Sequence, residues 1–321
     1  MEKISESPFE KKEKEPNKVA ARYYFFRHDE PVYSDEVAKL MNSHGYEVEH
    51  YSGAEFIADQ EVPEEQEGFH PSEKQLKKFK GRRRSETFEP RYEIEDRAKF
   101  EAVIKEPSSR ENLQPLVGIL EDKNVVPFII TGPRTRHGFS AQSINKSLKD
   151  QGIEIDQKSV IVTDMLTDMN KHWIYLTEIA EEKGLKNPWD AIRNPAYKQA
   201  LEEKNIETMV DIEERIKHFL QVLDRLFKKH KTNDPLLSEK FPAVISVTSD
   251  YSQLTLLKAL GIKEINGEPI LKFKPDVGSY VEVELMENGT AKIYYQARDQ
   301  QNPQLVGEVD DFYGKIKTNK V

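Results

Sequence analysis

The fold of this chain is indicated first by a stretch near its start, Arg22-Tyr-Tyr-Phe-Phe26, which runs directly into Arg27-His28-Asp29-Glu30-Pro31. Consecutive aromatic residues of this kind are typical of a strand that is buried in a sheet. A buried strand that ends in Arg-His places both side chains at the carboxyl edge of the sheet, where open α/β sheets bind ligands. The sequence therefore predicts an α/β protein with a candidate site beside Arg27 and His28.

The rest of the chain alternates between strand patterns and helix patterns. Apolar runs that are typical of strands buried on both faces occur at residues 125–131, 159–163 and 243–247. Helical patterns occur at residues 112–120, 140–150, 212–227 and 252–260, and alternating residues around the turn Asn288-Gly289 predict a hairpin. This order predicts a three-layer α/β/α sandwich with a mostly parallel central sheet.

One large domain with flanking segments is the organisation that these patterns predict. We expect residues 1–19 to form a disordered, charged leader, residues 20–300 a single α/β domain, and residues 301–321 a tail. Within the domain, residues of about 31–109 are predicted to be a partly irregular insertion, and residues of about 165–240 a helical cap region. Both ends are expected to be poorly ordered, because their composition buries too little apolar surface to offset chain entropy.

Composition narrows the classes of function. The formal net charge is −9. The negative electrostatic field of such a protein repels phosphates, which argues against a general nucleic-acid-binding protein. The chain has no cysteine, so disulfides and thiolate metal sites are excluded, and its histidines lack metal-ligand spacing. Neither a run of about 18 apolar residues nor a signal peptide is found. We therefore expect a cytoplasmic protein that uses no metal, no cofactor and no membrane.

Three short segments carry the candidate chemistry, and each follows a predicted strand. They are Arg27-His-Asp-Glu30, Thr131-Gly-Pro-Arg-Thr-Arg-His-Gly-Phe-Ser-Ala141 and Val247-Thr-Ser-Asp250. An imidazole can attack phosphorus, and guanidinium groups can hold phosphoryl oxygens. Further arginines from neighbouring strands would complete an anion pocket, so the three segments together predict a site for phosphoryl chemistry.

These segments resemble the signatures of the histidine-phosphatase (phosphoglycerate mutase-like) superfamily. That family's first strand runs into Arg-His-Gly-Glu, which reads Arg27-His-Asp-Glu30 here. Its second signature, Ser-Ser-Pro-x-x-Arg-Ala-x-x-Thr-Ala, resembles the second segment, and its apolar strand ending in Val-Ser-His-Gly resembles Val247-Thr-Ser-Asp250. The resemblance covers roughly residues 20–30 and 108–297 and implies a phosphoglycerate mutase-like fold.

The resemblance also implies roles for individual residues. His28 would be phosphorylated, and the phosphohistidine would then be hydrolysed or its phosphoryl group transferred. Arg27 and Arg136 would clamp the phosphoryl oxygens, with Arg134 assisting. Asp168 is the nearest match to the carboxylate that often serves as general acid in the family.

The chain departs from the family pattern at two positions. Asp29 replaces the glycine after the nucleophile, where a negative charge would repel phosphate. Ser249 stands where the family has its second histidine, and a serine donates one hydrogen bond to phosphate but no cationic one. Asp250 follows it, as a proton-donating aspartate does in the acid-phosphatase branch. His137 is expected to face solvent, although it offers a partial substitute for the missing histidine.

Two functions follow from the resemblance. In the first, the protein is a phosphomonoester hydrolase or mutase that works weakly through a phosphohistidine at His28. In the second, it is a catalytically impaired phosphatase-fold protein, a pseudoenzyme that binds a phosphorylated small molecule or phosphoprotein. A third reading makes the basic run of residues 74–84 a contact for an anionic partner such as RNA, although nucleic acid is not the expected ligand of the domain.

Overall fold

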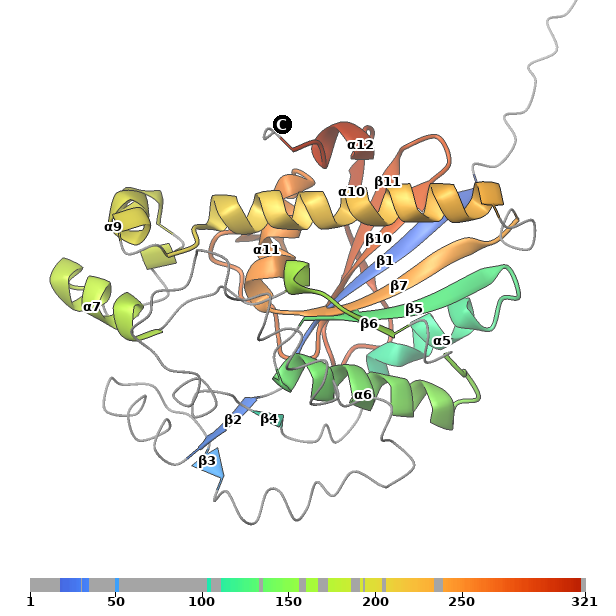
Figure 1. The fold of residues 1–321 in the computed structure, drawn as a ribbon, viewed down its shortest axis with the longest axis horizontal. Coiled ribbons are helices and arrows are strands. Elements are labelled where there is room, and N and C mark those ends of the chain that lie inside the picture. Colours follow the sequence, from blue (N-terminus) through green and yellow to red (C-terminus); the bar gives the residue numbers. More distant parts are fainter. Residues whose placement is uncertain are drawn as a thin grey trace, which may run out of the picture.

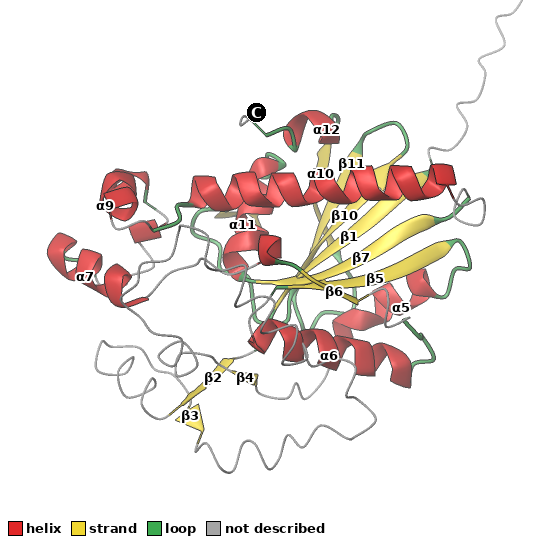
Figure 2. Ribbon diagram, viewed as in Figure 1, coloured by secondary structure: helices red, strands yellow, loops and turns green. Residues whose placement is uncertain are grey.

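The computed structural model describes residues 18–29, 31–34, 50–51, 103–104, 111–132, 135–155, 160–166, 173–185, 191–192, 194–203, 206–233 and 239–318. Its centre is a mixed sheet with helices on both sides (Figures 1 and 2). The leader at residues 1–17, most of the predicted insertion with its basic run, and Arg134 and Asp168 lie outside the described residues.

The central sheet has seven strands in the order β12-β11-β10-β1-β7-β5-β6. β1, β7, β5 and β6 pair in parallel, whereas β10, β11 and β12 pair antiparallel to their neighbours. β11 runs in the same direction as β1, because both are antiparallel to β10. Most strands of the sheet therefore run in the direction of β1, and the predicted fold class is confirmed. The bounds are β1 Val19–Arg27, β5 Val125–Thr131, β6 Val160–Val162, β7 Phe241–Thr248, β10 Tyr280–Met286, β11 Ala291–Gln296 and β12 Gln304–Val309.

The aromatic strand β1 joins the two hydrophobic layers. Tyr23 and Phe25 belong to the layer under α10 (Met209–Asn233) and α11 (Asp250–Ala259). Tyr24 and Phe26 belong to the opposite layer, under α5 (Gln114–Leu120) and α6 (Thr135–Asp150). All four side chains are at most 1% exposed. Both faces of β1 are therefore buried, which explains why its polar and apolar residues do not alternate as in a strand with one face in solvent.

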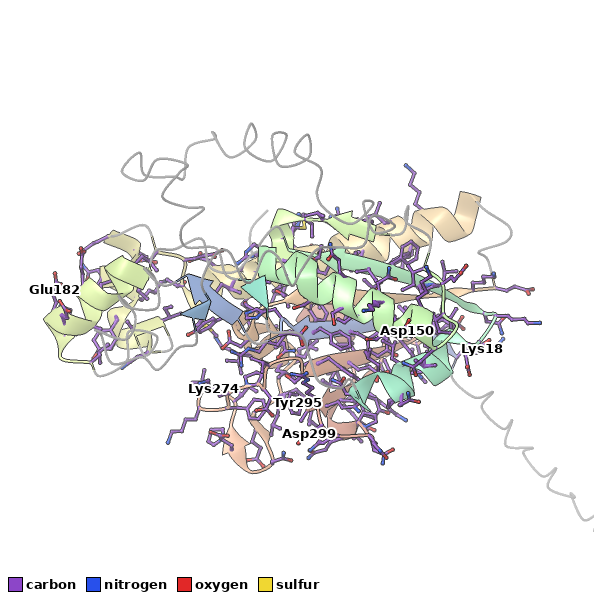
Figure 3. The ribbon with its side chains drawn as sticks, turned by 90° about the horizontal axis from the view of Figure 1, so that it is seen from below. Lys18, Asp150, Glu182, Lys274, Tyr295 and Asp299 are labelled. Atoms are coloured by element: carbon purple, nitrogen blue, oxygen red, sulfur yellow. The ribbon has the colours of Figure 1, made fainter. Side chains whose placement is uncertain are left out.

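The helices near the sheet run against its parallel strands. In Figure 3, Asp150 at the end of α6 lies at the same end of the molecule as Lys18, which precedes β1. The beginning of α6 is therefore at the carboxyl edge of the sheet.

On the other face, Glu213 of α10 forms ion pairs with Lys217 at 2.7 Å and with Lys258 of α11 at 3.2 Å.

The predicted cap region divides into two parts. α7 (Trp173–Lys183) and α9 (Lys198–Glu203) lie beyond the end of the sheet, and Glu182 marks the outer part of α7 (Figures 1 and 3). The long helix α10 instead packs on the sheet, where Phe219 meets Phe25 edge to face at 6.1 Å between ring centroids. The cap prediction was therefore wrong for α10, whose apolar stripe belongs to the core.

Short elements complete the described structure. Within the predicted insertion, β2 pairs with β3 and β4 in a small separate sheet. Their bounds are β2 Pro31–Ser34, β3 His50–Tyr51 and β4 Val103–Ile104, and the remaining short elements are η2 Glu111–Leu113, η4 Asp164–Leu166, η5 Pro195–Tyr197, β8 Glu264–Ile265, β9 Glu268–Pro269 and α12 Phe312–Lys315. Within the described ranges, none of the helices has the length and apolar character that a bilayer crossing requires.

The prediction of a tail at residues 301–321 was wrong. Residues 304–309 form the edge strand β12, which pairs with β11. Phe312 in α12 is fully buried and its ring stacks on that of Tyr23, with 6.4 Å between the centroids. Gln221 of α10 also donates a hydrogen bond to the Ile316 carbonyl at 2.9 Å. The C-terminal segment is thus part of the domain up to these contacts.

Candidate functional site

The parallel strands bring the three sequence segments to one edge. Arg27 at the end of β1 is level with Thr248 of β7, and Thr131 of β5 is level with Val247. The His28 N–H donates to the Thr248 carbonyl at 2.9 Å, and the Gly132 N–H donates to the Val247 carbonyl at 3.1 Å. The segments that follow β1, β7 and β5 therefore meet, as predicted from their positions after strands.

The His28 ring has one nitrogen committed to the backbone. Its Nδ1 lies 2.7 Å from the carbonyl oxygen of Asp29, and a carbonyl oxygen only accepts, so Nδ1 is the donor. In the neutral ring, the lone pair is then on Nε2, which is the tautomer that a nucleophilic imidazole needs. His28 is 6% exposed, so the ring is held in a largely water-free setting.

A second histidine contacts this ring. His137 lies in the first turn of α6 and its ring stacks on that of His28, with 5.5 Å between the centroids and 27° between the planes. His137 is fully buried, so the expectation that it faces solvent was wrong. The reason is the start of α6, which begins at Thr135 and not at Ser140, and which turns this side chain inward.

Arg27 is engaged by its own surroundings. Its Nη1 donates to the carbonyl of Pro275, and its Nη2 lies 3.9 Å from Oδ2 of Asp250. The other carboxylate oxygen of Asp250 accepts from the Tyr251 N–H at 2.9 Å. Both side chains of the Arg27–Asp250 pair are 15% exposed. The predicted phosphate clamp and the predicted proton donor therefore form a loose ion pair in this structure.

A buried tyrosine supports the loop that holds Arg27. The hydroxyl of Tyr295 accepts from the Asp276 N–H at 3.2 Å, next to Pro275. Burial raises the pKa of Tyr295, so its phenol stays protonated at neutral pH. Lys274, which precedes this loop, and Tyr295 are both labelled in Figure 3.

Ser249 has a structural task. It is the N-cap of α11, and its Oγ accepts from the Ser252 N–H at 3.5 Å. The Oγ atoms of the two serines also lie 3.4 Å apart. Ser249 is 4% exposed. The position that holds a histidine in the resembling family is thus used here to begin a helix.

The Asp29 side chain is turned toward the β10 side of β1. The backbone N–H of Asp29 donates to Oγ of Ser140 at 2.8 Å. Its Oδ1 lies 3.1 Å, and Arg298 Cδ 3.0 Å, from the point where Gly278 would carry a Cβ atom. Gly278 has a φ of 72°, which favours glycine, and its N–H donates to the His28 carbonyl at 3.2 Å. The carboxylate that was expected to repel phosphate thus has an arginine beside it.

Sequence reasoning missed Arg298 and assigned another role to Asn112. Arg298 follows β11 and matches no family signature. Asn112 is the first residue of the helix predicted at residues 112–120, but it is fully buried and its Nδ2 donates to the Gly278 carbonyl at 2.9 Å. Both residues lie against Gly278, whose N–H donates to the His28 carbonyl, and local patterns carry no signal for such distant contacts.

Two helix N-termini point at this edge. α6 begins directly after β5 and α11 directly after β7. The first N–H groups of a helix have no intrahelical partner, and the helix dipole places partial positive charge there. Such ends are suited to anions, so the two helix N-termini contribute partial positive charge at the edge around His28.

Three predicted residues lack a described side chain. Arg136 lies in the first turn of α6, but its side chain is not among the described ones, and Arg134 and Asp168 lie outside the described residues. Their predicted roles stay predictions. In the described part of the chain, no group of three or more acidic or histidine side chains is arranged to hold a metal ion.

Comparisons with known proteins were made at the levels of sequence and structure. No protein-family model matches the chain, and no curated protein matches it. Among solved structures, it is similar to a phosphoglycerate mutase from Bacillus anthracis, with 10% identity, 94% of this chain and 96% of that chain covered, and a TM-score of 0.44.

It is also similar to the alpha-ribazole phosphatase from Shigella flexneri, with 14% identity, 87% of this chain and 96% of that chain covered, and a TM-score of 0.40.

Proposed function

We propose that this chain is a divergent histidine-phosphatase-like protein that attacks phosphomonoesters through His28. The observation that carries the proposal is the tautomer of His28, because the Asp29 carbonyl accepts from Nδ1 and leaves Nε2 as the nucleophile. The ring stands at an edge where two helices begin and where a phosphate would be favoured. The substrate class is a phosphorylated small molecule or a phosphoprotein.

The reaction has two steps. In the first, Nε2 of His28 attacks phosphorus, an N–P bond forms, and the P–O bond to the leaving alcohol breaks while that oxygen takes up a proton. In the second, water or an acceptor alcohol attacks the phosphohistidine and gives its proton to the carboxylate that donated the first one, while the N–P electron pair returns to the ring. We assign Asp250 as the carboxyl group that donates the proton to the leaving oxygen. It would do so only after its contact with Arg27 loosens.

A second function is favoured by the contacts that already occupy the Arg27 side chain. Its guanidinium is held by the Pro275 carbonyl and lies beside Asp250, while Ser249 is used as a helix cap. A site without a ready cationic clamp would stabilise the transferring phosphoryl group poorly, and loss of one such donor typically costs about 10²–10³ in rate. Under this alternative, the protein binds a phosphorylated ligand or partner with little or no turnover.

One experiment separates the two functions. The protein is incubated with 4-nitrophenyl phosphate, and both released nitrophenol and acid-labile phosphate on His28 are measured. The enzyme proposal expects slow release and labelled His28, and both signals should vanish in His28→Ala. His218→Gln is the matched control, because His218 is exposed on α10.

Two outcomes would contradict the enzyme proposal. Orthovanadate binding without release or labelling would favour the binding function. Release that continues unchanged in His28→Ala would place the chemistry at another site and refute both functions of His28.

A further inference from the structure

The first turns of α6 direct two polar side chains at the His28 segment. Ser140 Oγ accepts from the Asp29 N–H at 2.8 Å, and the His137 ring stacks on the His28 ring at 5.5 Å. His137 is fully buried and Ser140 is 1% exposed. The helix that follows β5 therefore supports the end of β1 and reaches past the end of β7, which lies between these two strands in the sheet.

His137 occupies a helix position that packing alone would fill with an apolar residue. Among the α6 side chains that the structure describes, the buried apolar ones are Ala141, Ile144 and Leu148. His137 lies four residues before Ala141 and so continues the same helix face. Its place on this face brings an imidazole to the polar edge of the sheet, where it contacts the His28 ring.

Gly132 lets the His137 ring come this close. A Cβ atom on Gly132 would approach His137 Nδ1 and the Leu166 carbonyl oxygen to less than 3.0 Å, a separation that real Cβ atoms essentially never show. The Nδ1 edge of the ring is therefore turned toward the end of β5 and the backbone of η4. The His137 ring is thus fixed between Gly132 on one side and the His28 ring on which it stacks.

We infer that His137 is the second imidazole of the site and donates, as a cation, a hydrogen bond to the phosphoryl group at His28. This role rests on the proposed function and supplies the cationic donor that Ser249 lacks. The donor comes from the helix after β5, whereas the family pattern would place it after β7. No bond to His137 forms or breaks, because its N–H only stabilises negative charge on the phosphoryl oxygens.

Orthovanadate, which mimics a phosphoryl group, is the probe that tests this role without requiring turnover. Its affinity is measured by calorimetry for the unmodified protein, for His137→Gln and for the control His218→Gln. Glutamine keeps a neutral donor and removes the cationic one. We expect His137→Gln to weaken binding by about 10²-fold, the typical effect of losing one such donor, and His218→Gln to bind as the unmodified protein does.

A second measurement uses the unmodified protein, so that it decides the question even if His137→Gln does not fold. With ¹⁵N-labelled histidine, NMR reports whether one or both ring nitrogens of His137 carry a proton. In the vanadate complex we expect both to be protonated, a change that a purely structural histidine would not show.

The outcomes separate this inference from the proposed function. A folded His137→Gln that binds vanadate as tightly as the unmodified protein would overturn the role of His137 and leave that of His28 intact. A neutral His137 ring in the vanadate complex would do the same. An unmodified protein that neither binds vanadate nor becomes phosphorylated on His28 would overturn both.

Discussion

Gly132→Ala is the substitution that tests the geometry of the candidate site most directly. The new Cβ atom would come closer than 3.0 Å to two neighbours, Nδ1 of His137 and the backbone oxygen of Leu166. The imidazole can rotate away only by giving up its stack on His28. The carbonyl belongs to the backbone of η4 and also accepts from Thr248 Oγ1 at 3.2 Å, so it cannot move without breaking that bond.

The size of the effect follows from these two neighbours. Overpacking a well-packed interior typically costs about 1–3 kcal/mol, and we expect the upper half of this range because one neighbour is backbone. The free energy of unfolding is measured by urea denaturation with circular dichroism as the signal. Orthovanadate affinity, measured on the same samples, should fall as well, because a displaced His137 no longer faces the ligand.

Gly138→Ala is the matched control. Gly138 lies in α6, one residue after His137, and a Cβ atom there would meet nothing within 4 Å. Replacing a helical glycine by alanine typically stabilises a protein by about 0.5–1 kcal/mol, so the two variants should change stability in opposite directions. If Gly132→Ala unfolds at the same urea concentration as the unmodified protein, the close packing of His137 on Gly132 is refuted.

Three further predictions concern the frame around the site. Burial alone raises the pKa of the Glu213 carboxyl, but hydrogen bonds from its two lysines lower it below its ordinary value. The ion pairs of Glu213 with Lys217 and Lys258 therefore stabilise the fold above the ordinary pKa of 4.5 and progressively less as pH falls through the lowered pKa. In urea unfolding, Glu213→Gln should cost about 0.2–1 kcal/mol at pH 7 and less in acid. Phe312→Ala should cost about 3–5 kcal/mol in urea unfolding, because the fully buried ring stacks on Tyr23; a loss below about 1 kcal/mol would contradict the anchoring of the C-terminal segment. Ser249→Ala should cost about 0.5–1 kcal/mol through loss of the helix cap, and an unchanged unfolding midpoint would show that the cap contributes nothing.

Much of the fold could be predicted because its strands carry local signals. β1 is a run of aromatic residues and β5 and β7 are apolar runs, and each of these lies in the buried half of the sheet. The hairpin of β10 and β11 was signalled by alternation around Asn288-Gly289. Periodicity of this kind reports burial directly, so these elements could be located without tertiary information.

The C-terminal strand could not be predicted in the same way. β12 is an edge strand whose residues are mostly exposed or half-buried, and Leu305 is 48% exposed. Its residues carry little apolar alternation, and its backbone pairs with β11. The first turn of α6 was missed for a related reason, since Thr135-Arg-His-Gly138 has no apolar periodicity.

The sequence by itself determined which segments form the candidate site, because Arg27 ends a recognisable strand and His28 and Ser249 each stand directly after one. Only the tertiary structure decided what these residues touch. Strand order brings α6 to β1, so that His137 stacks on His28, and it brings the residues after β11 to Asp29. These partners are more than a hundred residues apart in the chain, and such contacts depend on how the strands are ordered and where the loops close, which no local pattern encodes.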